Sequence, residues 1–141
     1  MDHNQTMKDI LLSANTVASV GLSSNPEKES YHVVAYLKEQ GYKIIPVNPT
    51  ATEILGEKAY PSLSAIPDKV DLVQVFRKPE DVPPVVEEAI RIGAKVVWMQ
   101  EGIVNEEAAE RAREAGLQVV MDACMRAAHR RLMIGPNPIN L

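Results

Sequence analysis

Glycine, serine, asparagine, basic and aromatic residues gather directly after the β-like runs of this sequence. The residues with this placement are Gly21, Ser23, Ser24, Asn25, Lys28, Asn48, Pro49, Phe76, Arg77, Pro79, Gln100, Gly102 and Cys124. Small residues let a ligand approach the backbone, lysine and arginine pair with phosphate, and an aromatic ring can contact a purine base. The mixture favours binding of a nucleotide, and it predicts no catalytic and no metal-ligating residue.

The first of these loops matches known nucleotide-binding and catalytic motifs only in part. The dinucleotide fingerprint requires glycines where this chain has Gly21, Ser23 and Pro26, and an acidic residue where it has Asn48. A nucleophile elbow around Ser23 would need glycine in place of Asn25, and no Gly-Lys-Ser/Thr of a P-loop follows. NAD binding and hydrolysis are both disfavoured, while a tight turn alone also explains Gly21.

The remaining candidates for chemistry are one cysteine and some adjacent carboxylates. Cys124 precedes a helix-like run, where the helix N-terminus and Arg126 would stabilise a thiolate, although a small buried side chain explains it equally well. With His129 it supplies two possible metal ligands, whereas structural zinc requires four. Neighbouring acids such as Glu87 and Glu88 point in different directions on a helix and indicate a solvated surface.

The elements that position these residues are short β-like runs alternating with helix-like runs. Runs rich in β-branched residues cover 17–21, 43–47, 70–75, 95–99 and 117–121. Helices are predicted around 7–13, after Ser30 up to Gly41, from Pro79 to Gly93, from Asn105 to Ala115, and around 124–132, with a short one near 62–66. The alternation predicts an α/β fold, a doubly wound and mainly parallel five-stranded sheet with helices on both faces. Its strand ends would bring the candidate residues to one edge.

The length and composition of the chain predict a single domain, residues 1–141. The chain has a mass of 15.5 kDa, is 45% apolar and 24% charged, and carries a net charge of −4. A net negative charge provides no overall positive potential to attract nucleic acid or an anionic membrane, so neither is an expected partner. A single cysteine, no apolar run of about 20 residues and no signal-peptide core predict a cytoplasmic protein.

Five linked segments carry a resemblance to a known family. They are VASVGLS (17–23), GYKIIPVNP (41–49), VDLVQVFR (70–77), GAKVVWMQ (93–100), and VMDAC (120–124) followed by HRRL (129–132). The chain resembles the small single-domain CoA-binding proteins, which are similar to the N-terminal CoA-binding domain of succinyl-CoA synthetase α subunits. The likeness covers about 16–132, the expected core, and implies a Rossmann-like sheet that binds coenzyme A without known chemistry of its own.

The resemblance also implies a role for each matching residue. Gly21 and Ser23 would line the phosphate loop, with Lys28 beside them, and Asn48 and Pro49 would line the nucleotide pocket. Phe76, Arg77 and Pro79 would contact the adenine nucleotide. Gln100 and Gly102 would contact the pantetheine arm. Ala123 and Ala128 depart from the family, which commonly has arginine and glutamate at these places. The phosphorylated histidine of the synthetases belongs to a second domain outside the likeness, so ligase activity is not carried over.

The sequence therefore predicts non-catalytic binding of coenzyme A or acyl-CoA at the carboxyl ends of the strands. The pyrophosphate would rest on backbone amides from Ser23 to Asn25, with Lys28 and Arg77 neutralising its charge. Two alternatives stay open. One is a redox protein that exchanges Cys124 with the CoA thiol or CoA disulfide, and the other, less favoured, is an NAD-binding oxidoreductase.

Overall fold

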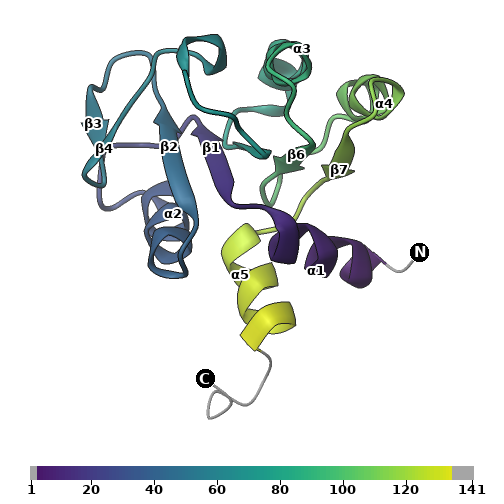
Figure 1. The fold of residues 1–141 in the computed structure, drawn as a ribbon, viewed down its shortest axis with the longest axis horizontal. Coiled ribbons are helices and arrows are strands. Elements are labelled where there is room, and N and C mark those ends of the chain that lie inside the picture. The colour runs from purple at the N-terminus through teal and green to yellow at the C-terminus, as the bar shows by residue number, and fades with distance from the viewer. Residues whose placement is uncertain (1–2, 135–141) are drawn as a thin grey trace.

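An all-parallel, five-stranded sheet forms the centre of the computed structural model, which describes residues 3–134 (Figure 1). Its strands are β1 (Thr16–Val20), β2 (Lys43–Val47), β5 (Leu72–Val75), β6 (Val96–Met99) and β7 (Gln118–Val120), in the order β2-β1-β5-β6-β7. The five predicted strands are thus confirmed. Every residue of β5 and β6 is buried, as expected of central parallel strands covered on both faces.

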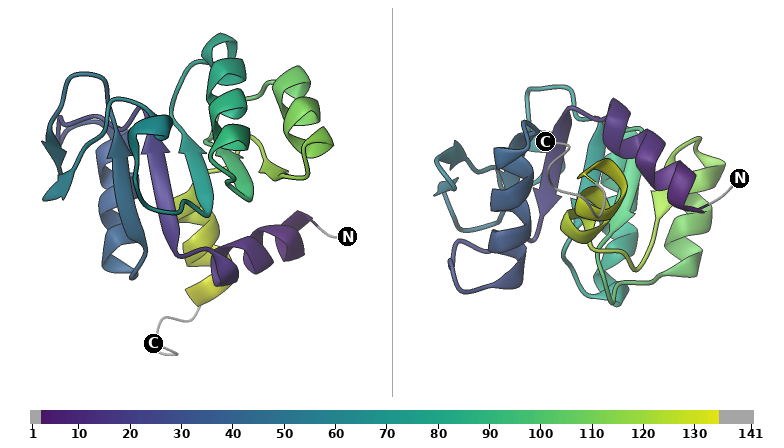
Figure 2. Two further views of the ribbon diagram at one scale, coloured as in Figure 1. Left: turned by 45° about the horizontal axis from the view of Figure 1, so that its top comes forward. Right: turned by 90° about the horizontal axis from the view of Figure 1, so that it is seen from below.

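Helices cover both faces of the sheet, which confirms the doubly wound fold (Figure 2). One face carries α1 (His3–Ser13), α2 (Glu29–Glu39) and α5 (Met125–His129), and the other carries α3 (Val82–Arg91), α4 (Glu106–Glu114) and the 3₁₀ turn η1 (Leu63–Ala65). Successive residues of a strand face opposite sides of the sheet, and each side has its own hydrophobic core. Val17 packs with α2 and α5, and Ala18 packs with α3 and α4. Ile10 of α1 is 1% exposed, so the core begins before residue 16.

The chain reverses its winding direction between β1 and β5. From β1 the sheet extends through β2 to one side, and from β5 it extends through β6 and β7 to the other. Val20 pairs with Val47 of β2 and with Val75 of β5, so the carboxyl ends of three strands lie level with one another. Ligands of open α/β sheets bind in the crevice at such a switch point.

The structure departs from the predicted elements at three places. Glu80 and Asp81 lie in a separate 3₁₀ turn (Pro79–Asp81) ahead of α3, because Pro83 and Pro84 favour a fresh helix start. After α5 the chain continues as a π-helical turn, Arg130–Ile134. Within the described residues, no helix is long and apolar enough to cross a membrane.

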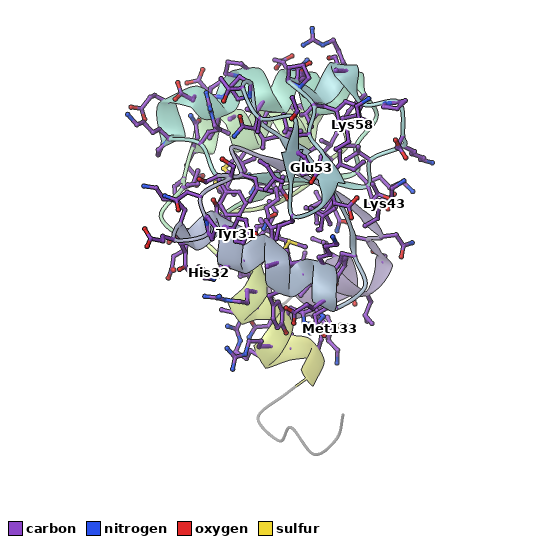
Figure 3. The ribbon with its side chains drawn as sticks, turned by 90° about the vertical axis from the view of Figure 1, so that its left-hand side faces the viewer. Tyr31, His32, Lys43, Glu53, Lys58 and Met133 are labelled. Carbon is purple, nitrogen blue, oxygen red and sulfur yellow. The ribbon has the colours of Figure 1, made fainter. Side chains whose placement is uncertain are left out.

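The third departure is a hairpin that was not predicted. Its strands β3 (Glu53–Ile54) and β4 (Glu57–Lys58) pair in antiparallel fashion, with Glu53 opposite Lys58. Figure 3 shows both side chains on the same side of the molecule as Lys43 of β2. Two-residue strands are too short to leave a period in the sequence.

A buried histidine joins three helices on one face of the sheet. His129 of α5 has its Nδ1 2.8 Å from the hydroxyl oxygen of Tyr36 in α2, and its ring also lies edge-on to Tyr42. Tyr42 in turn donates to the carbonyl of Leu11 in α1 at 2.6 Å. Burial lowers the pKa of His129 below its usual 6.5 and raises the pKa of Tyr42 to about 12.

We expect this histidine to make folding stability depend on pH. Because the pKa of His129 is lower in the folded than in the unfolded chain, the unfolded chain binds more protons near pH 6.5. The free energy of unfolding should fall as the pH drops from about 7.5 to about 5.5, and urea denaturation at both values measures this fall. His129→Gln should flatten the dependence, and His32→Gln, at an exposed site on α2 (Figure 3), should keep it. Equal slopes in parent and His129→Gln would contradict the assignment.

Candidate functional site

Gly21 occupies the turn at the carboxyl end of β1 in a conformation that requires glycine. Its φ is +87°, and a Cβ there would lie 3.0 Å from Cδ of Arg77 and 3.2 Å from the carbonyl carbon and oxygen of Phe76. Its N–H donates to the carbonyl of Val47 at 3.0 Å, while the N–H of Phe76 donates to the carbonyl of Val20 at 2.9 Å. The turn therefore draws the ends of β1, β2 and β5 together.

A cleft of about 260 Å³ opens beside this turn. Three of the predicted site residues line it, namely Gly21, Pro49 and Arg77. Pro61 and Pro84 add further apolar wall, and neither was predicted to belong to the site. The carboxylates of Asp81 and Glu88 also line the cleft. Apolar walls with an arginine at the rim suit a flat ring system that is joined to phosphate.

The loop between β1 and α2 is held by its own side chains. Ser30 Oγ accepts from the N–H of Ser23 at 3.1 Å, and Ser23 Oγ accepts from the N–H of Asn25 at 3.0 Å. Asn25 Oδ1 accepts from the N–H of Glu27 at 2.9 Å. Two of the amides predicted to cradle pyrophosphate are thus bonded to hydroxyl oxygens, which a phosphate oxygen would have to replace.

The two cations predicted to meet phosphate are exposed at this edge. Lys28 directly precedes α2, and Arg77 directly follows Phe76 at the end of β5. Among residues 3–134, neither forms an ion pair within 4.0 Å. Ser24 and Pro79 are also exposed, on the loops that carry these two cations.

Asn48 fastens the end of β2 to the loop after β1. Its Nδ2 donates to the carbonyl of Leu22 at 3.0 Å, and its Oδ1 accepts from the N–H groups of Thr50 and Ala51 at 2.9 and 3.0 Å. An aspartate would lack the donor that reaches Leu22. The position therefore favours asparagine over the acidic residue that binds an NAD ribose.

Phe76 and Arg77 point to different sides of the sheet edge. Phe76 is half-buried against the core beneath α1, α2 and α5, whereas Arg77 lines the cleft beside α3. Consecutive residues of an extended segment alternate in this way. The predicted contact of both side chains with the adenine nucleotide stays a prediction, and of the two only Arg77 lines the cleft.

Gln100 lies inside the protein and belongs to a buried chain of polar side chains. Ser19 Oγ donates to Gln74 Oε1 at 2.8 Å, and Gln74 Nε2 donates to Gln100 Oε1 at 3.1 Å. The same Gln100 oxygen accepts from the N–H of Met125, the first residue of α5, at 3.0 Å. The side-chain oxygen of Gln100 thus has two partners within the protein, Gln74 and Met125. The predicted contact of Gln100 with the pantetheine arm stays a prediction.

Cys124 borders a second hollow, of about 460 Å³, at the ends of β6 and β7. It is half-buried and immediately precedes α5. Gly102 lies nearby, since its N–H donates to Oδ1 of Asp122 at 2.6 Å. Arg126, the expected partner of a thiolate, instead donates to Oε1 of Glu29 at 2.7 Å. Cys124 and Gly21 therefore border separate hollows of the same sheet edge.

Comparison with known proteins agrees with the observed fold. The profile of the CoA binding domain family matches residues 15–130. The uncharacterized protein YneT of Bacillus subtilis is 46% identical over 123 residues, which covers 87% of this chain and 91% of that protein. The α subunit of the ADP-forming acetate–CoA ligase II of Pyrococcus furiosus is 33% identical over 138 residues, which is 96% of this chain and 29% of that subunit.

A solved structure of similar size shows the same fold. A hypothetical protein from Pyrococcus horikoshii superposes with a TM-score of 0.90 at 44% identity, covering 94% of this chain and 93% of that chain. The predicted resemblance to single-domain CoA-binding proteins and the Rossmann-like fold are confirmed. With most of its length matched by the family profile, the chain belongs to the CoA binding domain family.

Proposed function

We propose that this protein binds coenzyme A or acyl-CoA at the carboxyl ends of β1, β2 and β5, without catalysing a reaction on it. The observation that carries the proposal is the turn at Gly21, where the missing side chain lets the ends of β1 and β5 approach closely beside a cleft lined by prolines and the cation Arg77. Membership of the CoA binding domain family supports coenzyme A as the ligand.

The adenine nucleotide end of CoA fits the cleft lined by Gly21, Pro49 and Arg77. Its phosphates would lie towards the loop after β1, where the guanidinium of Arg77 and the ammonium of Lys28 offset their charge. A protein with a net charge of −4 needs such local cations to hold a polyanion.

The pantetheine arm would follow the sheet edge from β5 towards β6 and β7. Adjacent strands lie about 4.8 Å apart, so three steps from β1 to β7 span about 14 Å. This course passes Gly102 and leads towards Cys124, where the thiol or acyl end would lie.

Removal of Arg77 should weaken CoA binding and leave the fold intact. A charge-assisted hydrogen bond contributes about 1.5–3 kcal/mol, so Arg77→Ala should raise the dissociation constant for CoA roughly 10- to 100-fold. Calorimetric titration of the parent with CoA, acetyl-CoA, NAD and ATP measures the selectivity, and titration of the variant with CoA measures the loss.

Arg91→Ala is the matched control, because Arg91 is exposed at the far end of α3. We expect it to bind CoA like the parent. Two results would overturn the proposal: a parent that binds NAD but not CoA, or equal CoA affinities of Arg77→Ala and the parent.

A further inference from the structure

One wall of the nucleotide cleft comes from segment 61–64, which follows β4 and enters the 3₁₀ turn η1. Pro61 and Ser62 line the cleft. The segment is anchored to β2 on one side, because the N–H of Tyr60 donates to the carbonyl of Pro46 at 3.0 Å and the N–H of Asn48 donates to the carbonyl of Tyr60 at 2.9 Å. Backbone bonds to β2 thus hold the start of this wall, and the bonds from Ala65 to Ser62 and from Ile66 to Leu63 lie within the turn itself.

Glu88 of α3 anchors the other side. Its Oε1 accepts from the N–H of Leu63 at 3.1 Å, and its Oε2 accepts from the N–H and the hydroxyl of Ser64 at 3.3 and 2.9 Å. Both carboxylate oxygens are therefore engaged by one short segment. Glu88 is itself half-buried and lines the same cleft as Gly21 and Arg77.

We propose that Glu88 is a positioning residue for the nucleotide end of CoA, an inference that rests on the proposed function. By tying Leu63 and Ser64 to α3, the carboxylate fixes the wall before the ligand arrives. Binding to a preformed cleft avoids the entropy cost of ordering that segment.

Simple electrostatics predicts the opposite effect of this residue. A carboxylate beside an anionic nucleotide repels it, so neutralising Glu88 should tighten binding if charge were its whole role. A positioning role predicts weaker binding after neutralisation. The direction of the change therefore separates the two explanations.

The test compares Glu88→Gln with Glu87→Gln on the full chain. Glu87 is the neighbouring residue of α3 and loses the same charge, but it bonds Arg111 of α4 at 2.8 and 3.1 Å and does not line the cleft. Dissociation constants are measured by calorimetry for three ligands. CoA carries both ends, adenosine 3′,5′-bisphosphate carries only the nucleotide end, and 4′-phosphopantetheine carries only the pantetheine end.

We expect Glu88→Gln to weaken CoA and adenosine bisphosphate by a similar factor, roughly tenfold, and to leave phosphopantetheine unchanged. Glu87→Gln should match the parent for all three ligands. Ser64→Ala, which removes only one donor and spares the backbone bonds, should weaken the two nucleotides roughly threefold and serves if Glu88→Gln fails to fold.

Tighter or unchanged nucleotide binding in Glu88→Gln, or an equal loss for phosphopantetheine, would overturn the positioning role while the proposed function stands. A parent chain that binds neither CoA nor adenosine bisphosphate would overturn both. The two failures are thus distinguishable in one series of titrations.

Discussion

Gly21→Ala should be the most damaging single substitution at the sheet edge. A side chain in the left-handed region costs about 1–2 kcal/mol, and forcing a methyl group into a filled space costs about 1–3 kcal/mol more. The nearest atoms include the Phe76 carbonyl, which cannot retreat without straining the bond from the Phe76 N–H to Val20. We expect a loss of about 2–5 kcal/mol in the free energy of unfolding and no measurable CoA binding.

Gly93→Ala separates the two causes. Gly93 has a φ of +77° but no atom within 4 Å of its would-be Cβ, and it follows α3, at the opposite edge of the sheet. Its alanine variant should lose only the conformational part, about 1–2 kcal/mol, and should bind CoA like the parent. Urea denaturation and CoA titration of both variants give the comparison. Equal losses of stability, or retained CoA binding in Gly21→Ala, would show that the close approach at Gly21 has no role.

The sheet could be predicted because each strand is recognisable from its own local sequence. The runs 70–75 and 95–99 are almost continuously apolar and rich in valine, which is typical of strands buried on both faces. Glycine ends such as Gly93 and Gly116 mark the returns from helix to strand, and the structure gives both a positive φ. Local signals of this kind suffice for the order of elements.

The wall of the cleft was not predictable, because its contacts join residues far apart in the chain. Glu88 bonds Leu63 across 25 positions, and neither residue carries a local signal of that pairing. The expectation that Glu87 and Glu88 point in different directions is confirmed, since one reaches Arg111 and the other Ser64. Glu87 is exposed, as the interpretation of a solvated surface expects, whereas Glu88 is half-buried, and each bonds a group outside its own helix.

Side-chain direction also limited the prediction of the site. Sequence position places Phe76, Arg77 and Gln100 at strand ends, but it does not fix which face of the sheet each one serves. Phe76 and Gln100 turn towards the core that carries α5, and Arg77 turns towards α3. The strand-end rule therefore places these residues at one edge of the sheet, but it does not say which of them line the same cleft.

Breaking the buried hydrogen-bonded chain of Ser19, Gln74 and Gln100 should lower the free energy of unfolding strongly. Gln100→Leu would leave the N–H of Met125 and the side-chain amide of Gln74 buried without an acceptor, since Met125 and Gln74 are both 0% exposed. Each of these two unsatisfied buried groups costs about 1–3 kcal/mol, so the free energy of unfolding should fall by about 2–6 kcal/mol. The N–H of Met125 should also exchange with solvent deuterium faster than in the parent.

Gln118→Leu provides the control for this substitution, because Gln118 is exposed on the edge strand β7. It should change the free energy of unfolding by no more than about 0.5 kcal/mol. If Gln100 acts by holding α5, the Gln100→Leu chain should still bind adenosine 3′,5′-bisphosphate like the parent, because the cleft proposed for the nucleotide lies among β1, β2 and α3. Parent-like stability of Gln100→Leu, or unchanged exchange at Met125, would contradict the role assigned to the buried amide chain.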